Sequence, residues 1–464
     1  MKKNKFLISL GIMSAALAPI APLAISCAKN DTKKQEGAKS ESSALNKDDF
    51  TLAKESFAKL TDDQKLQVLN EANLNQALSQ DQLHELIAKF NKDAGSFGGI
   101  VWYIKSAESL IAKEAAYKNG IEAYKKLMEN EKNKNLFDFS EARNYNTTKH
   151  VTNAATDKFV PVVFMDIDET VLQNDLTEAG AMINGGFSNA NKEKEDLMSR
   201  RFAVPGAVEF INYVQSHGGL VIYNSDMNQS EAMRDAVKEN LKRIGVEFIA
   251  NYQFWMRGTL PYQTNIDSEI TKEKTENMTK EQLSALAKKL EFTDSFRDKP
   301  WEPWKNTLSA EIIGKKALKT LRMNGLDAKT DGWNLSVEDS GSGNAVKLKT
   351  IMRVGDNFDD FFDGYSRGKD NDLRVKFYKD NAWMKDIFSV NGAKAHTWNL
   401  KTNKFDENDF QQAYIMVPGN AEYGGWNREY GYGNVQKFYE AIKKIVSNPR
   451  YQSGPSATDN IVRR

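Results

Sequence analysis

The sequence predicts an α/β protein with a doubly wound parallel-sheet core, helical amino-terminal elements and a cap or insertion. Two observations carry this prediction. Three short apolar runs of strand length are separated by segments with helical periodicity. Each run ends in acidic or hydroxyl residues, and ligands bind at the carboxyl ends of strands in open parallel sheets. Strands that alternate with helices form βαβ units, and these units give a parallel sheet.

Composition allows a chain of several domains without a nucleic-acid footprint. The 464 residues are enough for two or three domains, and a hydrophobic content of 40% supports a sizeable core. The 64 Lys and Arg residues nearly balance the 63 Asp and Glu residues. No excess of positive charge therefore points to a nucleic-acid polymer as a partner.

The amino terminus has the pattern of a secretory lipoprotein signal over residues 1–26. Lysines precede an apolar run from Phe6 to Ile25, and small residues lead to Cys27, the only cysteine. Ala-Ile-Ser-Cys at 24–27 resembles the lipobox of bacterial lipoproteins. We expect Cys27 to carry a lipid that anchors the protein to the outer face of the bacterial cell membrane. An uncleaved membrane helix with an incidental cysteine is the alternative.

The remaining chain divides by composition into four parts. Residues 27–49 are polar and predict a flexible tether, because they hold too few large apolar side chains to form a core. Residues 50–155 predict a helical amino-terminal region, including a stretch from Val101 to Leu127. The α/β core is expected over 156–446, with an insertion near 252–311, and a disordered tail is expected over 447–464.

The first predicted strand, Val162–Met165, is followed by Asp166 and Asp168. On an extended backbone, side chains at i and i+2 point to the same side. Two like charges at the end of an apolar strand are costly unless a cation or a shared proton compensates them. A solvated polar turn is the alternative interpretation of this pair.

Two further strands repeat the pattern. Leu220–Tyr223 ends in Asn-Ser-Asp at 224–226, and a strand over Thr350–Val354 ends in Gly-Asp-Asn-Phe-Asp-Asp at 355–360. Apolar periodicity and turn signals predict further helices over 189–201, 208–215, 231–244, 280–290, 315–323 and 435–446.

Taken together, these motifs resemble the haloacid dehalogenase (HAD) superfamily of phosphohydrolases, and within it the class C, lipoprotein-type bacterial acid phosphatases. The matching stretches are Asp-Ile-Asp-Glu-Thr at 166–170, Val-Pro-Gly-Ala at 204–207 and Gly-Asp-Asn-x-x-Asp-Phe at 355–361. The segments at 102–117 and 418–426 are similar to that family too. The resemblance covers roughly residues 95–445 and implies a Rossmann-like HAD core.

The resemblance implies roles for the residues at the strand ends. Asp166 would be the nucleophile that forms an aspartyl-phosphate. Asp168 would protonate the leaving alcohol and then activate water. Ser225 would donate a hydrogen bond to the transferring phosphoryl group.

The family also has a lysine between its second and third strand motifs. Lys319 is our choice, because Lys-Thr-Leu-Arg at 319–322 fits the family's Lys-x-x-Arg pattern. Lys347 and Lys349 lie nearer the third strand and remain alternatives, and all three are compatible with solvated surface positions.

Mg²⁺ is the cofactor that the resemblance implies, a hard cation that prefers oxygen ligands. Its expected ligands are Asp166, the backbone carbonyl of Asp168, and Asp356. Asp360 would support these ligands or bind the ion through a water molecule.

The expected substrates are small phosphomonoesters, with nucleoside monophosphates as a family-level expectation. The candidates for stacking on a nucleotide or aromatic leaving group are Trp102, Tyr103, Tyr423 and Trp426. Structural packing is the alternative, and periodicity favours it. After Ser225 the family usually has Asn-Arg, whereas this chain has Asp-Met, a departure that bears on substrate preference.

The sequence thus predicts a membrane-anchored, Mg²⁺-dependent phosphomonoesterase with acid phosphatase activity. Two alternatives stay open: a non-catalytic surface lipoprotein, such as an adhesin or ligand-binding protein, and a phosphotransferase that passes the phosphoryl group to another alcohol. None of the four histidines lies in an Arg-His-Gly setting, which argues against histidine-dependent acid phosphatase chemistry.

Overall fold

The structure, a computed structural model, describes residues 102–137, 158–174, 177, 189–270, 272–275, 277–302, 316–335, 345–399, 401–419 and 447. The predictions for Cys27, for Tyr423 and Trp426, and for the helix over 435–446 lie outside these residues. Among the residues described, no helix combines the length and the apolar character needed to cross a membrane.

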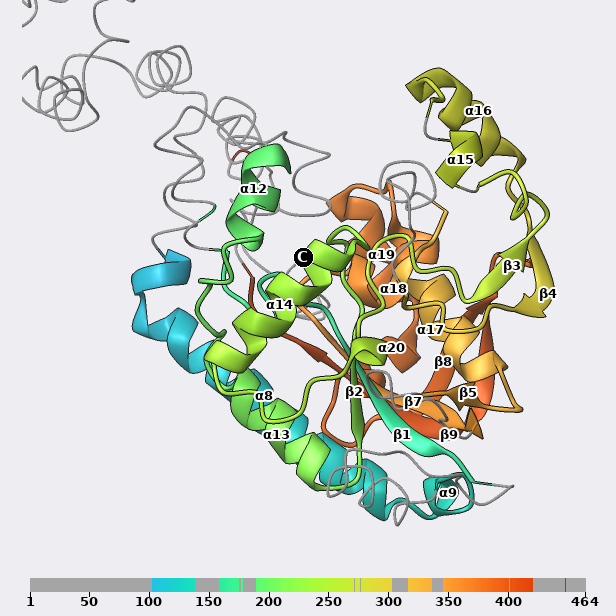
Figure 1. Cartoon of the computed structure of the whole chain (residues 1–464). Coiled ribbons are helices and arrows are strands. Elements are labelled where there is room, and N and C mark those ends of the chain that lie inside the picture. The colour runs from blue at the N-terminus through green and yellow to red at the C-terminus, as the bar shows by residue number, and fades with distance from the viewer. Residues whose placement is uncertain are drawn as a thin grey trace, which may run out of the picture. The chain divides into compact units, whose positions relative to one another are not determined.

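A five-stranded sheet forms the centre of the described part (Figure 1). Its strands, in spatial order, are β2 (Leu220–Tyr223), β1 (Val160–Met165), β7 (Leu348–Gly355), β9 (Lys404–Met416) and β8 (Ala393–Asn399). The first four are parallel, and β8 pairs with β9 antiparallel at the edge. The three strands expected from the sequence are therefore confirmed, and they are neighbours.

Helices cover both faces of the sheet, as a doubly wound fold requires (Figure 1). One face packs against α8 (Ala107–Glu129), α13 (Ala207–Ser216) and α14 (Glu231–Arg243). The other packs against α17 (Lys319–Ala328), α18 (Asp359–Ser366) and α20 (Ala382–Ile387). Side chains along β1 alternate between the two: Val163 and Met165 join the first cluster, and Val162 and Phe164 join the second.

Local sequence signals explain where several helices begin. Ser106 and Ser230 cap α8 and α14 by accepting hydrogen bonds from backbone N–H groups of the first turn. Gly206 precedes α13 with φ of 87°, and a Cβ there would lie 3.0 Å from Cβ of Tyr117. Glycine is required at this point both for its conformation and for the close approach of α8.

Several elements differ from the expectation or extend it. The predicted helix over 315–323 begins instead at Lys319 and runs to Ala328, and β8 and β9 were not predicted. The remaining short elements are α9 (Glu131–Lys134), α12 (Asn189–Asp196), η1 (Asn251–Gln253), β5 (Trp333–Asn334), β6 (Ala345–Val346) and α19 (Asn371–Asp380).

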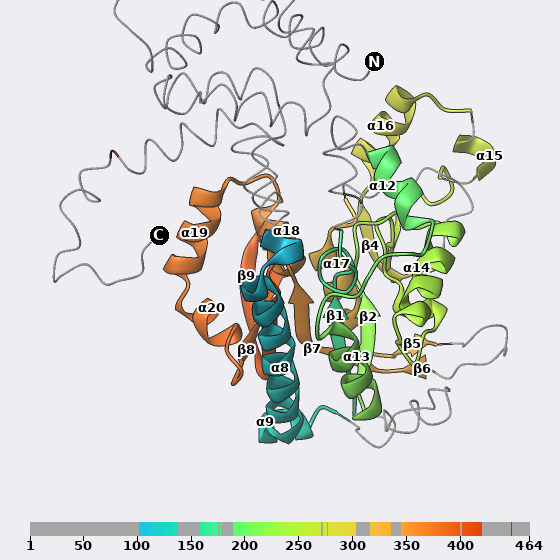
Figure 2. The ribbon, with the colours of Figure 1, turned by 90° about the vertical axis from the view of Figure 1, so that its left-hand side faces the viewer.

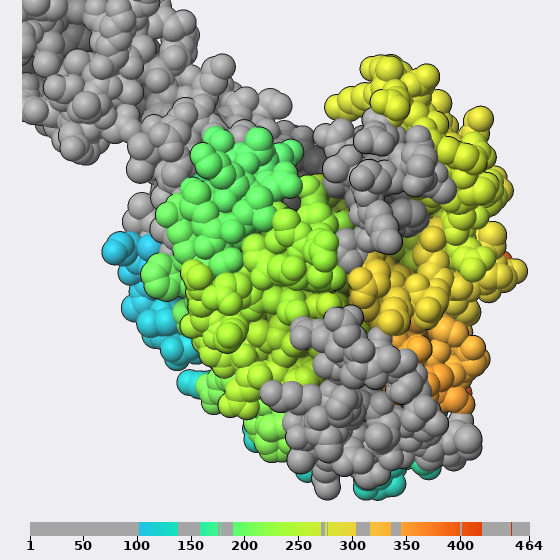
Figure 3. All heavy atoms as spheres, in the orientation of Figure 1, coloured from blue at the N-terminus to red at the C-terminus, as the bar shows by residue number. Residues whose placement is uncertain are grey.

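The predicted insertion forms a small cap at the end of the sheet toward which β7 points (Figure 2). It consists of β3 (Tyr262–Thr264), α15 (Lys272–Thr275), α16 (Lys280–Lys289) and β4 (Phe292–Phe296). Its apolar cluster includes Leu260 and Leu286 and reaches Leu321 of α17. Residues 252–256, which the sequence assigned to the insertion, are buried in the main core. Helix α12 and the cap both project from this end of the described part of the chain (Figure 3).

Candidate active site

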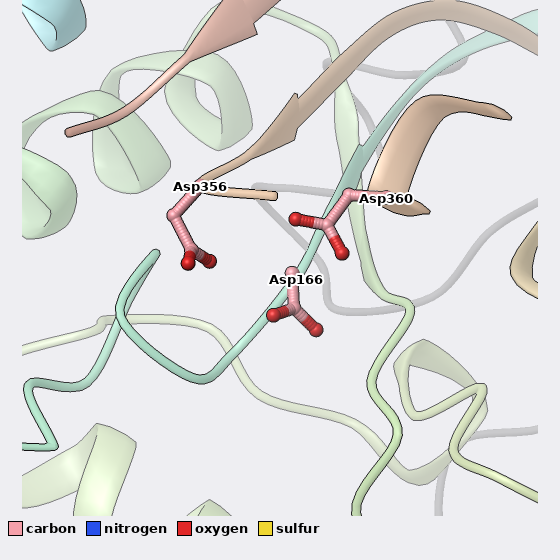
Figure 4. Close-up of side chains that lie close together, drawn as sticks. All are labelled: Asp166, Asp356 and Asp360. Carbon is pink, nitrogen blue, oxygen red and sulfur yellow. The ribbon is translucent and has the colours of Figure 1, made fainter. Parts of the chain in front are cut away.

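The acidic residues at the strand ends meet at one edge of the sheet. Asp166 follows β1, Asp356 follows β7, and Asp360 lies in the first turn of α18. Figure 4 shows these three carboxylates grouped together. One oxygen from each lies within 4.8 Å of the others, so the three could hold one metal ion. The metal ligands expected at Asp166, Asp356 and Asp360 are thus brought together.

The turn after β7 holds Asp360 close to the strand end. A Cβ at position 355 would lie 2.3 Å from Oδ2 of Asp360, so only glycine permits this approach. The backbone N–H of Asn357 donates a 2.8 Å hydrogen bond to the same oxygen. The Gly-Asp-Asn-x-x-Asp spacing therefore has a direct structural purpose.

The lysine at this cluster is Lys319. Its Nζ donates hydrogen bonds of 2.6 Å to Oδ1 of Asp166 and 2.7 Å to Oδ1 of Asp360, and all three side chains are buried. The two alternative lysines lie elsewhere: Nζ of Lys347 is 6.0 Å from the ring centre of Phe159, and that of Lys349 is 4.2 Å from the ring centre of Phe410.

Helix α17 positions Lys319 through a cap that comes from another helix. Leu318, at the N-cap position, has no side chain able to accept a hydrogen bond. Asp363 of α18 takes this role by accepting from the backbone N–H of Lys319 at 2.6 Å and of Thr320 at 2.8 Å. The first helical residue is therefore fixed beside the carboxylates.

Burial and mutual repulsion dominate the electrostatics of the cluster. Burial raises the pKa of Asp166 to about 7, with Lys319 opposing the rise and Asp360 adding to it. Burial also raises the pKa of Asp356 well above its usual value, and the nearby carboxyls of Asp360 and Glu169 add to this effect. A divalent cation would relieve this concentration of negative charge.

These residues fit a divalent metal by their chemistry. Carboxylate oxygens are the donors that hard divalent cations select, and buried carboxylates need a compensating charge. Asp166, Asp356 and Asp360 supply such oxygens. Glu169 adds a fully buried carboxyl beside Asp356, on a backbone with φ of 54°, which is rare outside glycine.

The chain that follows β9 passes close to this cluster. A Cβ at position 419 would lie 2.7 Å from Oδ2 of Asp356 and 2.9 Å from Oε2 of Glu169. Gly419 therefore allows the backbone to touch both carboxylates. The site thus includes a fourth strand end, which the sequence interpretation missed because it did not identify β9.

Helix α8 contacts the site through the side chain of Tyr117. The phenol of buried Tyr117 donates a hydrogen bond to the carbonyl of Thr170, and the hydroxyl of Thr170 donates to Oδ1 of Asp356 at 3.0 Å. Burial raises the pKa of Tyr117 well above its ordinary value, and the charges of Asp356 and Asp166 raise it further. Tyr117 therefore stays a neutral donor.

Asp168 lies outside the three-carboxylate group. Its Oδ1 accepts hydrogen bonds from Nζ of Lys192 at 2.9 Å and from Nη1 of Arg201 at 2.8 Å. Burial alone would raise the pKa of Asp168, but these two cations hold it well below its usual range. The side chain of Asp168 is therefore paired with its own two cations. It does not join the three carboxylates that could hold a metal ion.

Ser225 is buried at the end of β2, and a buried arginine fixes its backbone. Nη1 of Arg322 donates to the carbonyls of Ser225 and Trp255, both at 2.7 Å. Nη2 of Arg322 donates to Oδ1 of Asp226 at 2.9 Å. The Lys-x-x-Arg pattern therefore contributes twice, with Lys319 at the carboxylates and Arg322 behind Ser225.

Two of the aromatic candidates, Trp102 and Tyr103, lie in the part of the chain that the structure describes, and they differ in exposure. Trp102 is 41% exposed, whereas Tyr103 is buried, with Nζ of Lys113 3.3 Å from its ring centre. Tyr103 therefore packs within the amino-terminal helical region, as the alternative interpretation holds.

Sequence reasoning missed Lys192 and Arg201. Both lie in a segment predicted as a charged helix, and such a charge pattern is typical of a solvated surface. The charge run itself held no signal for the contact with Asp168, which is 24 residues from Lys192.

A doubly wound sheet thus gathers three carboxylates and one lysine at its strand ends, an arrangement that could hold a divalent metal ion. The chain belongs to the HAD superfamily, subfamily IIIB (acid phosphatase), which it matches over residues 102–386. The expected superfamily membership and the doubly wound fold are thereby confirmed, and the chain is a phosphomonoesterase of the acid phosphatase type.

Two solved structures are similar to this chain. The class C acid phosphatase from Bacillus anthracis is 15% identical, with a TM-score of 0.39, over 75% of this chain and 95% of that chain. The same enzyme with tungstate bound is 16% identical, with a TM-score of 0.38 and the same coverage.

Proposed function

We propose that this protein hydrolyses small phosphomonoesters in a Mg²⁺-dependent reaction through an aspartyl-phosphate on Asp166. The observation that carries the proposal is the contact of Lys319 with both Asp166 and Asp360, beside Asp356. A buried ammonium between two carboxylates favours the ionised form that a nucleophile needs and adds positive charge where a phosphate must bind.

The reaction has two steps. In the first, a carboxylate oxygen of Asp166 forms a bond to phosphorus as the bond from phosphorus to the leaving oxygen breaks, and Asp168 gives that oxygen a proton. In the second, water attacks the phosphorus and gives a proton to Asp168. The bond from Asp166 to phosphorus then breaks, which releases inorganic phosphate and restores both side chains.

The chain's own groups hold the phosphoryl group during both steps. The ammonium of Lys319 balances negative charge on the transferring oxygens, and the hydroxyl of Ser225 is the expected hydrogen-bond donor to them. Asp166, Asp356 and Asp360 would hold the divalent cation, which when bound supplies further charge stabilisation.

The substrate class includes 5′-nucleotides in this proposal. Support comes from Trp102, whose exposed side chain is available for stacking, and from the family-level expectation. The Asp-Met that follows Ser225 places a carboxylate, Asp226, beside Arg322 at this edge of the site. Because Asp226 adds negative charge there, it would disfavour substrates with additional anionic groups near this point.

We also propose that the enzyme acts at the outer face of the bacterial cell membrane, anchored through a lipid on Cys27. The support is the sequence pattern of residues 1–27. Metabolic labelling with palmitate, on the wild type beside Cys27→Ser, tests this: label on both proteins would contradict the assignment.

The central experiment is phosphate release by the full-length protein from a panel of alkyl, aryl and nucleoside monophosphates, with Mg²⁺ or with EDTA. Asp166→Asn is the inactive variant, and Asp386→Asn, an exposed aspartate of α20, is the matched control. We expect Mg²⁺-dependent release that Asp386→Asn retains and Asp166→Asn loses. Acid-quenched reactions with ³²P-labelled substrate should trap label on the wild type and none on Asp166→Asn.

Two outcomes would overturn the proposal. Equal inactivity of folded wild type and Asp166→Asn across the panel would favour a non-catalytic surface lipoprotein. Label transfer to an added alcohol in place of water would favour a phosphotransferase.

A further inference from the structure

Asp168 is held by a buried network of charges that the two-step reaction does not by itself require. Lys192 and Arg201 both contact Asp168, and both also contact Asp196, at 2.7 Å and 3.0 Å. The side chains of Arg201 and Asp196 are almost fully buried. The network therefore fixes α12, through Lys192 and the helix's last residue Asp196, against the residue that the proposed function assigns to acid–base work.

The two cations share one oxygen of Asp168. Lys192 and Arg201 both donate to Oδ1, at 2.9 Å and 2.8 Å. Within the described residues, Oδ2 of Asp168 accepts no hydrogen bond, and 22% of the side chain is exposed. One oxygen is thus anchored by two donors, and the other is left to interact with a substrate.

We propose that Lys192 is a positioning residue for the acid–base step: with Arg201 it holds Oδ1 of Asp168 in place and leaves Oδ2 available to contact the leaving oxygen of the substrate. This inference rests on the proposed function. In the first step the proton moves from Oδ2 to the leaving oxygen as its bond to phosphorus breaks. Without a donor from Lys192 the carboxyl could turn about its Cβ–Cγ bond, and Oδ2 would lose its alignment with the leaving oxygen.

Lys192 and Arg201 have different shares in this arrangement. Arg201 also donates to the carbonyls of Leu172 at 2.8 Å and Gln173 at 3.0 Å, and to the side chain of Asn174. Its loss would therefore disturb the whole segment that follows Asp168. Within the part of the chain that the structure describes, the polar contacts of the Lys192 side chain are with Asp168 and Asp196 alone, and 17% of this side chain is exposed, which makes it the residue to test.

The test compares a substrate that needs a proton donor with one that does not. An alkoxide leaves only if it is protonated, whereas 2,4-dinitrophenolate leaves without a proton. We would measure kcat/KM with Mg²⁺ for glycerol 2-phosphate and for 2,4-dinitrophenyl phosphate. This parameter reports the steps up to the first phosphoryl transfer, so later hydrolysis of the aspartyl-phosphate does not mask the effect.

The full-length variants are Lys192→Met, Lys192→Arg and, as a matched control on the same helix, Lys194→Met, whose side chain is exposed. We expect Lys192→Met to lose about 100-fold on the alkyl ester and less than about threefold on the dinitrophenyl ester. Lys192→Arg should recover most of the alkyl activity, because it restores a donor to Oδ1. Lys194→Met should resemble the wild type on both substrates.

Asp168→Asn separates this inference from the proposed function. If Asp168→Asn loses activity selectively on the alkyl ester but Lys192→Met loses both substrates equally, or neither, the positioning role of Lys192 is overturned and the proposed function stands. If Asp168→Asn shows no dependence on the leaving group, the acid role of Asp168 fails and the inference fails with it.

Discussion

Nζ of Lys319 donates a 2.6 Å hydrogen bond to Oδ1 of Asp166, across 153 positions of sequence. This contact joins the end of β1 to the start of α17. The same ammonium also donates a 2.7 Å hydrogen bond to Oδ1 of Asp360, so one cation contacts two buried carboxylates. Charge balance at Asp166, the proposed nucleophile, therefore depends on a helix that follows the cap in sequence.

Replacing Lys319 with Met should lower kcat by at least about 100-fold, because the transferring phosphoryl group loses a buried cation and Asp166 loses the charge that favours its ionised form. Lys347→Met is the control, since Lys347 lies beside Phe159 and away from the carboxylates. We expect that control to stay within about twofold of the wild type. Comparable losses in the two variants would argue against the special place of Lys319.

Stability of the metal-free protein should depend on pH in an unusual direction. The pKa of Asp166 is raised to about 7 in the folded protein, chiefly by burial, and those of Asp356 and Asp360 are raised as well. Between pH 4 and 7 the folded state therefore binds more protons than the unfolded state. The stabilisation is complete below the unfolded pKa and is lost as pH rises through the folded pKa.

We accordingly expect the free energy of unfolding in EDTA to fall by a few kcal/mol between pH 4 and pH 7. A saturating divalent cation should flatten that fall, because it compensates the ionised carboxylates and binds only the folded state. Urea unfolding followed by tryptophan fluorescence measures both profiles. Identical profiles with and without the cation would contradict a metal site at these residues.

Asp363 should matter for stability and for placing the lysine. Asp363→Ala removes the acceptor of two backbone N–H groups at the start of α17 and leaves them buried, at a cost of about 2 kcal/mol. Asp386→Ala, at an exposed position of α20, should cost less than about 0.5 kcal/mol. Chemical denaturation of both variants provides the comparison, and equal effects would show that the cap from α18 is dispensable.

Gly419 should govern metal affinity. Gly419→Ala places a methyl group where Oδ2 of Asp356 and Oε2 of Glu169 now approach the backbone, so one of them must move. We expect the dissociation constant for Mg²⁺, measured by calorimetry on the free protein, to rise about tenfold or more.

Gly120→Ala is the control for this substitution. Its Cβ would lie 2.9 Å from Cε2 of Phe210 in the core, away from the carboxylates. It should lower Tm and leave the dissociation constant unchanged. An unaltered dissociation constant in Gly419→Ala would show that the backbone after β9 does not contribute to the metal site.

The parts of the site that the sequence predicted are those carried by local patterns. Buried apolar runs identified β1, β2 and β7, and because the strands are parallel their carboxyl ends had to meet. The family pattern then selected Lys319. The apolar residues of these strands are contiguous, so no long-range information was needed to find them.

The missed parts depend on contacts between distant segments. Strand β9 begins with Lys-Phe-Asp-Glu-Asn-Asp, which is typical of a loop, and only its second half, from Phe410, is mostly buried. The start of α17 is set by Asp363, 44 residues away, so no residue at the helix end marks it. Lys192 reaches Asp168 only after α12 folds back over the strand end, and its charged neighbourhood gave no sign of this.

The position of β9 between β7 and β8 also has a consequence for how the chain reaches its native state. Until residues 404–416 emerge from the ribosome, β7 presents an unpaired edge, and β8 has no partner to join. An open edge is a template for pairing with other chains. A nascent chain that stalls before β9 should therefore aggregate, and the hairpin of β8 and β9 should dock as one late unit that completes both the sheet and the surroundings of Asp356.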